Sequence, residues 1–298
     1  MNTMTETARQ MRIKWAAGDM VRDAGLTYPE DVERRTDIVY GEHPENLLDI
    51  YYPQGTTEPL PTIISVHGGG WFYGSKELYS HYCTRLARRG FTVVNFDYRL
   101  APEHQYPAPL EDTFAVMRWM QRHAQEYCMD LNNVFLVGDS AGGQIGFQVL
   151  TMLTNPKYAA LCRIPVPEDF KVRACGLNCG AYFIPPFNRF LTPEKASIMF
   201  KFYFPENYAP IVPQLKTHKY ITRDFPPAFI MTAAHDYLKI MAKPLHLLMK
   251  MKGAKSQYHF FGTKEDTEMK HVFHLNCRLP EADRCNDMQC EFFRSHMV

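Results

Sequence analysis

The segment Gly-Asp-Ser-Ala-Gly at 138–142 constrains the fold of this chain more than any other feature. It follows a short apolar run at 134–137 and opens a segment at 141–153 that is apolar almost all round. The first pattern predicts a buried strand and the second a buried helix. A G-x-S-x-G sequence at such a junction forms a sharp turn that exposes its serine at the end of the sheet. Ser140 is therefore a candidate nucleophile.

A second glycine-rich turn lies upstream. His-Gly-Gly-Gly-Trp at 67–71 follows the β-branched run 62–66. Glycines lack a Cβ, so a substrate can approach their backbone N–H groups closely. Such groups stabilise a developing oxyanion, as does the N–H that follows a nucleophilic serine at a helix N-terminus. The candidate oxyanion donors are Gly68, Gly69, Gly70 and Ala141.

Strand and helix patterns alternate along the chain. The chain begins with an expected helix at 8–24 and two expected strands within 37–52. We expect further helices at 78–89, 107–123, 141–153, 244–252 and 279–295. We expect further strands at 62–66, 91–96, 134–137, 172–178, 228–233 and 257–261. This order predicts right-handed crossovers and a mostly parallel sheet covered by helices on both faces. We therefore expect a single α/β domain over 1–298.

One segment departs from this alternation. Residues 182–222 are rich in aromatic residues and proline, without a clean strand–helix unit. A long excursion of this kind is usually functional, and this one would lie over the carboxyl ends of the strands. We interpret it, with residues 1–36, as a cap; a packed surface insertion without substrate contact is the alternative. The residues expected to line a pocket beneath it are Trp71, Asp139, Tyr182 and Phe183.

A serine nucleophile requires a base, and the base requires an orienting carboxylate. Asp236 follows the predicted strand 228–233, and His271 follows the strand 257–261 after a polar loop. The order Ser, Asp, His is that of serine hydrolases on a parallel sheet. His274, three residues further on, is the rival base. The pair His271 and His274 has no evident third ligand, so we expect no metal site.

Composition excludes several other classes of function. The formal net charge is +1, with no basic patch of the kind that binds nucleic acid. No apolar stretch approaches the length of a membrane span, and the polar start has no signal-peptide pattern, so we expect a cytoplasmic protein. The eight cysteines include no C-x-x-C pair and are expected to be free thiols.

These motifs, together with Asp-Tyr-Arg-Leu-Ala-Pro-Glu-His at 97–104 and the segment 106–112, resemble the hormone-sensitive-lipase family of α/β-hydrolases. The resemblance covers about 45–275. It implies an α/β-hydrolase fold, a triad of Ser140, Asp236 and His271, a helical cap and hydrolysis of short-chain carboxylic esters without a cofactor. Dimers through the sheet edge or the cap are also common in that family. Two departures are the absence of a second aspartate after Asp236 and of a glycine after His271.

The motifs and the resemblance together predict a serine carboxylesterase. Its substrates would be small short-chain acyl or aryl esters, cleaved through an acyl-enzyme intermediate. Two alternatives remain: an amidase or deacetylase that uses the same three residues, and a catalytically inert binder of small molecules on this fold.

Overall fold

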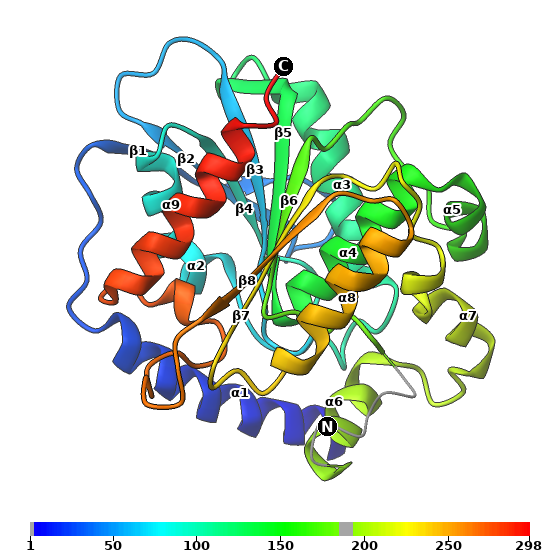
Figure 1. Ribbon diagram of the computed structural model, residues 1–298. Coiled ribbons are helices and arrows are strands. Elements are labelled where there is room, and N and C mark those ends of the chain that lie inside the picture. The colour runs from blue at the N-terminus through cyan, green and yellow to red at the C-terminus, as the bar shows by residue number, and fades with distance from the viewer. Residues whose placement is uncertain (1–2, 185–192) are drawn as a thin grey trace.

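The computed structural model describes residues 3–184 and 193–298 and contains one mixed eight-stranded sheet. The strand order across the sheet is β1-β2-β4-β3-β5-β6-β7-β8 (Figure 1). The strands are β1 (Val32–Val39), β2 (Leu47–Pro53), β3 (Leu60–Val66), β4 (Thr92–Phe96), β5 (Met129–Asp139), β6 (Ala174–Asn178), β7 (Ala228–Ala233) and β8 (Ser256–Phe261).

The sheet is parallel except at one edge. β2 pairs antiparallel with both β1 and β4, whereas the pairs from β4 to β8 are all parallel. The carboxyl ends of β3, β5 and β7 therefore meet at the same edge of the sheet, which is where ligands bind in open α/β folds. The predicted α/β-hydrolase fold is confirmed.

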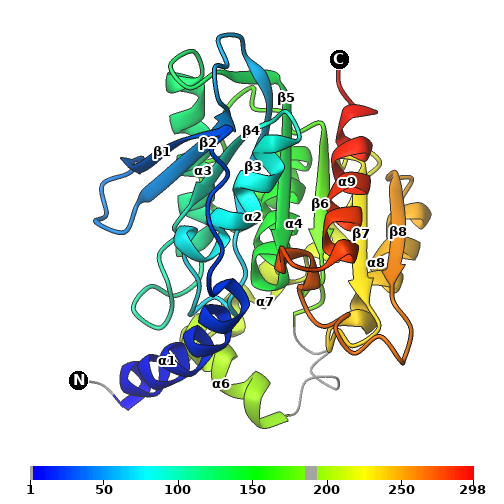
Figure 2. The same cartoon turned by 90° about the vertical axis from the view of Figure 1, so that its left-hand side faces the viewer.

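Helices cover both faces of the sheet (Figures 1 and 2). Side chains of α3 (Ala108–His123), α4 (Ser140–Thr154) and α8 (Lys239–Met251) pack in one core cluster, and those of α2 (Lys76–Arg88) and α9 (Pro280–Arg294) in a second. The central strands explain this division, because successive side chains point to opposite faces. In β5, Leu136 belongs to the first cluster, and its neighbours Phe135 and Val137 belong to the second.

Two helices lie beyond the carboxyl ends of the strands. Figures 1 and 2 show α1 (Thr3–Asp23) and α6 (Pro193–Tyr203) close together at this end of the molecule. They come from the two segments predicted to form a cap. Residues 32–36 of the first segment belong to the sheet instead, because β1 begins at Val32. Residues 185–192 of the second lie outside the described part of the chain.

Shorter helices complete the structure: α5 (Pro156–Cys162), α7 (Val212–Leu215) and the 3₁₀ turns Ala209–Ile211, Thr217–Lys219 and Phe273–Leu275. No pattern in the sequence predicts α5, a seven-residue helix whose first turn is capped by the Asn155 side chain. All eight cysteines are free thiols, and all but Cys128 are buried. Across 3–184 and 193–298, no helix combines the length and apolar character that crossing a bilayer requires.

Candidate active site

Ser140 lies at the junction of β5 and α4, in a backbone conformation that few side chains adopt. Its φ is 52°, in the left-handed region. The turn is crowded: a Cβ on Gly142 would lie 2.0 Å from the Val66 carbonyl oxygen. Only glycine fits there, and the packing of this turn against β3 holds Ser140 in its unusual conformation.

Asp236 and His271 are joined by a short hydrogen bond. The His271 Nδ1 lies 2.6 Å from Asp236 Oδ1 and donates to it. Asp236 follows β7 and is buried, whereas His271 follows β8 and keeps 16% of its side chain exposed. With Nδ1 bound to the carboxylate, the other ring nitrogen is the one available to act as a base.

The Asp236 carboxylate has two further hydrogen-bond donors. The Thr232 hydroxyl donates to Oδ2 at 2.6 Å, and the Leu238 backbone N–H donates to Oδ1 at 2.8 Å. Burial alone would favour the neutral acid, but His271 and these donors stabilise the anion more, so the pKa of Asp236 is lowered. Asp236 therefore stays ionised and can hold the imidazole in one tautomer.

His274, the alternative candidate for the base, is buried. Its ring packs edge-on against Tyr82, with centroids 5.3 Å apart. Burial lowers its pKa to about 3, so it is neutral at physiological pH. His271, and not His274, is bonded to the carboxylate and lines the cavity that holds Ser140.

The glycine-rich turn is held by side chains beneath it. The Gly68 N–H donates to the Tyr79 hydroxyl at 2.7 Å, and Tyr79 donates to Asp139 Oδ2 at 2.8 Å. The Gly68 N–H is therefore already engaged, and the prediction that it binds an oxyanion loses its geometric basis. Gly69 and Gly70 line the cavity with positive φ angles of 113° and 60°.

His67 also supports the glycine turn. Its Nδ1 lies 2.7 Å from the Gly68 carbonyl oxygen, and its ring stacks on Tyr98 with centroids 4.0 Å apart. Burial lowers the pKa of His67 to about 4, so the ring is neutral. This residue supports the turn and does not face the cavity.

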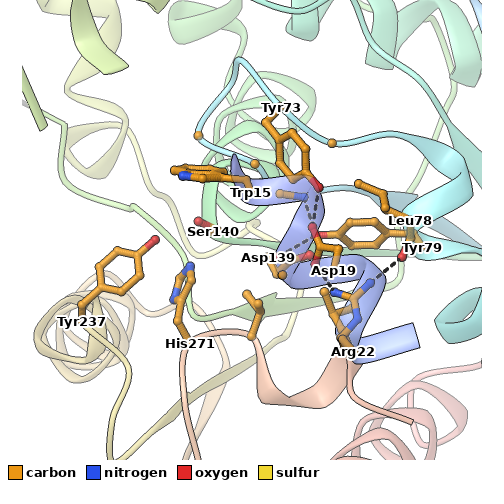
Figure 3. Close-up of a pocket in the computed structure, with 17 residues that line it drawn as sticks. Trp15, Asp19, Arg22, Tyr73, Leu78, Tyr79, Asp139, Ser140, Tyr237 and His271 are labelled. Atoms are coloured by element: carbon orange, nitrogen blue, oxygen red, sulfur yellow. Dashed lines mark hydrogen bonds and ion pairs between the residues drawn. The ribbon is translucent and has the colours of Figure 1, made fainter. Parts of the chain in front are cut away.

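A cavity of about 330 Å³ brings the predicted residues together. Ser140, Asp139 and His271 line it, as do the glycines of the turn (Figure 3). The first helix closes it, through Trp15, Gly18, Asp19 and Arg22. The remaining lining residues are Tyr73, Gly74, Leu78, Tyr79, Tyr237, Val272 and Leu275.

One wall of this cavity is polar. Asp19 accepts hydrogen bonds from the Tyr73 hydroxyl at 2.5 Å and from Arg22 at 2.7 Å. Arg22 also pairs with Asp23 and donates to the Leu78 carbonyl oxygen. These bonds tie α1 to the segment after the glycine turn, so the helix forms a fixed wall of the cavity.

Three of the residues predicted to line a pocket lie elsewhere. The Trp71 ring stacks on Tyr203 at 4.9 Å, and its Nε1 donates to Gln144. Tyr182 is buried edge-on against Phe147, and Phe183 lies near His218. None of them is among the described residues that line the cavity. Asp139 lines it as predicted.

Two parts of the site lie outside the residues predicted from the sequence. They are Tyr237 and the residues of α1 that line the cavity. The position directly after Asp236 was an available signal for Tyr237. Nothing in the pattern of α1 indicated that Asp19 and Arg22 would meet Tyr73 across the cavity.

Two groups of side chains in the described residues have metal-ligand spacing. Cys179, Asp236 and His271 form one, but here Asp236 and His271 are bonded to each other. His43, Glu45 and His104 form the other, away from the lining of the cavity. The first group thus shares its carboxylate and imidazole with the arrangement described above, and the second group lies outside that arrangement.

Comparisons with known proteins show the family to which this chain belongs. The profile of a family described as alpha/beta hydrolase fold matches residues 63–275. Esterase B from Lactobacillus rhamnosis superposes with a TM-score of 0.89 at 25% identity, over 98% of this chain and 94% of that one. The versiconal hemiacetal acetate esterase of Dothistroma septosporum is 27% identical over 83% of this chain and 76% of its own length.

A third relative, the esterase LipC of Mycobacterium tuberculosis, is 29% identical over 62% of this chain and 46% of its own length. The chain therefore belongs to the alpha/beta-hydrolase family, and its resemblance to the hormone-sensitive-lipase family is confirmed.

Proposed function

We propose that this protein is a serine carboxylesterase whose triad is Ser140, Asp236 and His271. One observation carries the proposal: the Asp236–His271 hydrogen bond of 2.6 Å lies at the same cavity as Ser140 and the glycine turn. The names of its relatives support an esterase, because Esterase B, LipC and the versiconal hemiacetal acetate enzyme are all called esterases.

In this proposal, Ser140 attacks the ester carbonyl carbon while His271 accepts the serine proton. The oxyanion that forms is held by the backbone N–H groups of Gly69, Gly70 and Ala141. Collapse breaks the bond to the alcohol, which leaves with the proton from His271. Water then attacks the acyl-enzyme in the same way and releases the acid.

The cavity supports small substrates. Its volume of about 330 Å³ is at the lower end of the range for small-molecule sites. Residues of α1 form one of its walls. Its apolar lining is confined to a few side chains, among them Trp15, Leu78 and Val272. We therefore propose short-chain acyl or aryl esters as substrates.

A series of p-nitrophenyl esters from C2 to C16 tests this function, with Ser140→Ala alongside. We expect hydrolysis of the short esters, a decline with chain length, and a loss of at least ~10³-fold in the variant. Preference for C16 over C4 would overturn the substrate assignment. Activity on matched amides alone would favour the amidase alternative, and binding without turnover would favour the inert binder.

A cytoplasmic location and activity without a cofactor remain part of the proposal, and a homodimer is the oligomeric state that the resemblance to the family suggests. The mechanism above needs only protein groups and water. Sedimentation of the purified protein tests the dimer, and a sedimentation coefficient of a monomer at micromolar concentration would contradict it.

A further inference from the structure

Tyr237 stands beside the base of the triad. The centroid of its ring lies 4.1 Å from that of His271, and the two planes are inclined by 40°. It lines the same cavity as Ser140. Figure 3 shows the phenol with its hydroxyl on the side of Ser140 and His271.

Core packing does not account for this position. Tyr237 is 52% exposed, whereas Tyr79, on the opposite wall of the cavity, is buried. A half-exposed aromatic ring gains only part of the free energy that burial provides. Its ring instead contacts the His271 imidazole, and its side chain lines the cavity that Ser140 also lines.

The backbone that carries Tyr237 is fixed by the catalytic carboxylate. Asp236 Oδ1 accepts both the His271 Nδ1–H at 2.6 Å and the Leu238 N–H at 2.8 Å. The Lys239 N–H donates to the Asp236 carbonyl oxygen at 3.2 Å. One carboxylate oxygen therefore orients the base and also holds the turn from which Tyr237 projects.

Loss of hydration raises the pKa of Tyr237, although its contact with Ser140 opposes the rise. The phenol therefore keeps its proton over the neutral range. A neutral phenol can donate one hydrogen bond to a substrate oxygen.

We propose that Tyr237 acts on the leaving-group side of the triad. Its ring restricts the His271 imidazole, and its hydroxyl donates a hydrogen bond to the alkoxy oxygen of the ester. When the bond from the acyl carbon to that oxygen breaks, the electron pair goes to the oxygen, which takes the proton from His271. Tyr237 keeps its own proton throughout. This inference rests on the proposed esterase function.

Two esters with the same acyl group distinguish this role from a structural one. p-Nitrophenolate leaves without help, whereas an alkoxide needs stabilisation as it departs. In Tyr237→Phe, which preserves the ring, we expect kcat/KM for ethyl butyrate to fall about fivefold, as for loss of one hydrogen bond. For p-nitrophenyl butyrate we expect less than a twofold change.

Removal of the ring should affect both esters. In Tyr237→Ala, we expect kcat to fall by roughly tenfold or more for both, because the imidazole is no longer restricted on that side. Tyr237→Phe keeps the ring and should therefore not show this tenfold fall in kcat. Tyr208→Phe is the matched control, since Tyr208 is 41% exposed and does not line the cavity.

The possible results distinguish a failure of the proposed esterase function from a failure of the proposed role of Tyr237. If wild-type protein hydrolyses neither ester, the proposed function is overturned and the role of Tyr237 with it. If wild-type protein is active and Tyr237→Phe loses the same factor on both esters, or nothing on either, only the role of Tyr237 is overturned.

Discussion

The Tyr79 hydroxyl joins the two motifs of the site, because it accepts from the Gly68 N–H at 2.7 Å and donates to the Asp139 carboxylate at 2.8 Å. Asp139 directly precedes Ser140, and Gly68 opens the glycine turn. One phenol in α2 therefore links the turn that carries Ser140 to the glycine turn.

Replacement of Tyr79 by phenylalanine should loosen this link. We expect kcat/KM for p-nitrophenyl butyrate to fall roughly tenfold, because misplacement of oxyanion donors is costly. Tyr82→Phe is a matched control: Tyr82 is buried in the same helix, and its hydroxyl has no hydrogen-bond partner among the described residues. Equal losses in the two variants would contradict the account.

Asp139 gives a prediction for the pH dependence of stability. Burial raises its pKa to about 7, so the folded protein holds a proton that the unfolded chain releases near pH 4. This contribution is fully present below about pH 4 and is lost as pH rises to 7, at no more than about 1.4 kcal/mol per pH unit.

Asp139→Asn keeps an acceptor for Tyr79 but does not titrate. Urea unfolding of both proteins at pH 5 and pH 8 measures the effect. We expect the free energy of unfolding of the variant, relative to wild type, to be higher at pH 8 than at pH 5. A difference that does not change with pH would contradict a raised pKa at Asp139.

Gly69→Ala should abolish most activity. The residue has a φ of 113°, and a Cβ would lie 1.9 Å from the Tyr73 carbonyl oxygen, so the turn must move. Loss of one oxyanion donor lowers kcat by about 10²–10³-fold. Gly55→Ala has a similar positive φ of 78° with free space around it, and should leave kcat unchanged. Comparable activity of the two variants would argue against this role of the turn.

Arg12 anchors the first helix to the site. Its guanidinium donates to the carbonyl oxygens of Phe72 and Ala101 and pairs with Glu103. In Arg12→Ala we expect KM to rise severalfold with little change in kcat. The reason is that α1 forms a wall of the cavity but contributes none of the three residues of the proposed triad. Arg9→Ala removes only an exposed pair with Glu6 and should leave KM unchanged. A KM equal to that of wild type in Arg12→Ala would contradict the anchoring role.

The sequence predicted those features that depend on local signals. Short β-branched runs and amphipathic periods indicated the strands and most helices, and the ends of those strands indicated Ser140, Asp236 and His271 as candidates. The structure places Ser140 and His271 at one cavity, and Asp236 is bonded to His271. The helix α8 begins before its predicted start at residue 244, and Pro244 lies within it.

Other features depend on contacts between distant segments, which no local pattern encodes. Trp71 directly follows the glycine turn and has a φ of 66°. Its side chain stacks on Tyr203 and does not line the cavity. The engagement of Gly68 by Tyr79 depends on the position of α2 against the turn. The wall formed by Asp19 and Arg22 depends likewise on how α1 crosses the site.

Covalent labelling tests the central claim most directly. The protein is incubated with diethyl p-nitrophenyl phosphate, and the modified peptide is located by mass spectrometry. The account predicts one diethylphosphoryl group on Ser140, no adduct there in Ser140→Ala, and labelling slowed by at least ~10³-fold in His271→Ala. Labelling of a different residue, or labelling of Ser140 at an unchanged rate in His271→Ala, would contradict a triad in which His271 activates Ser140.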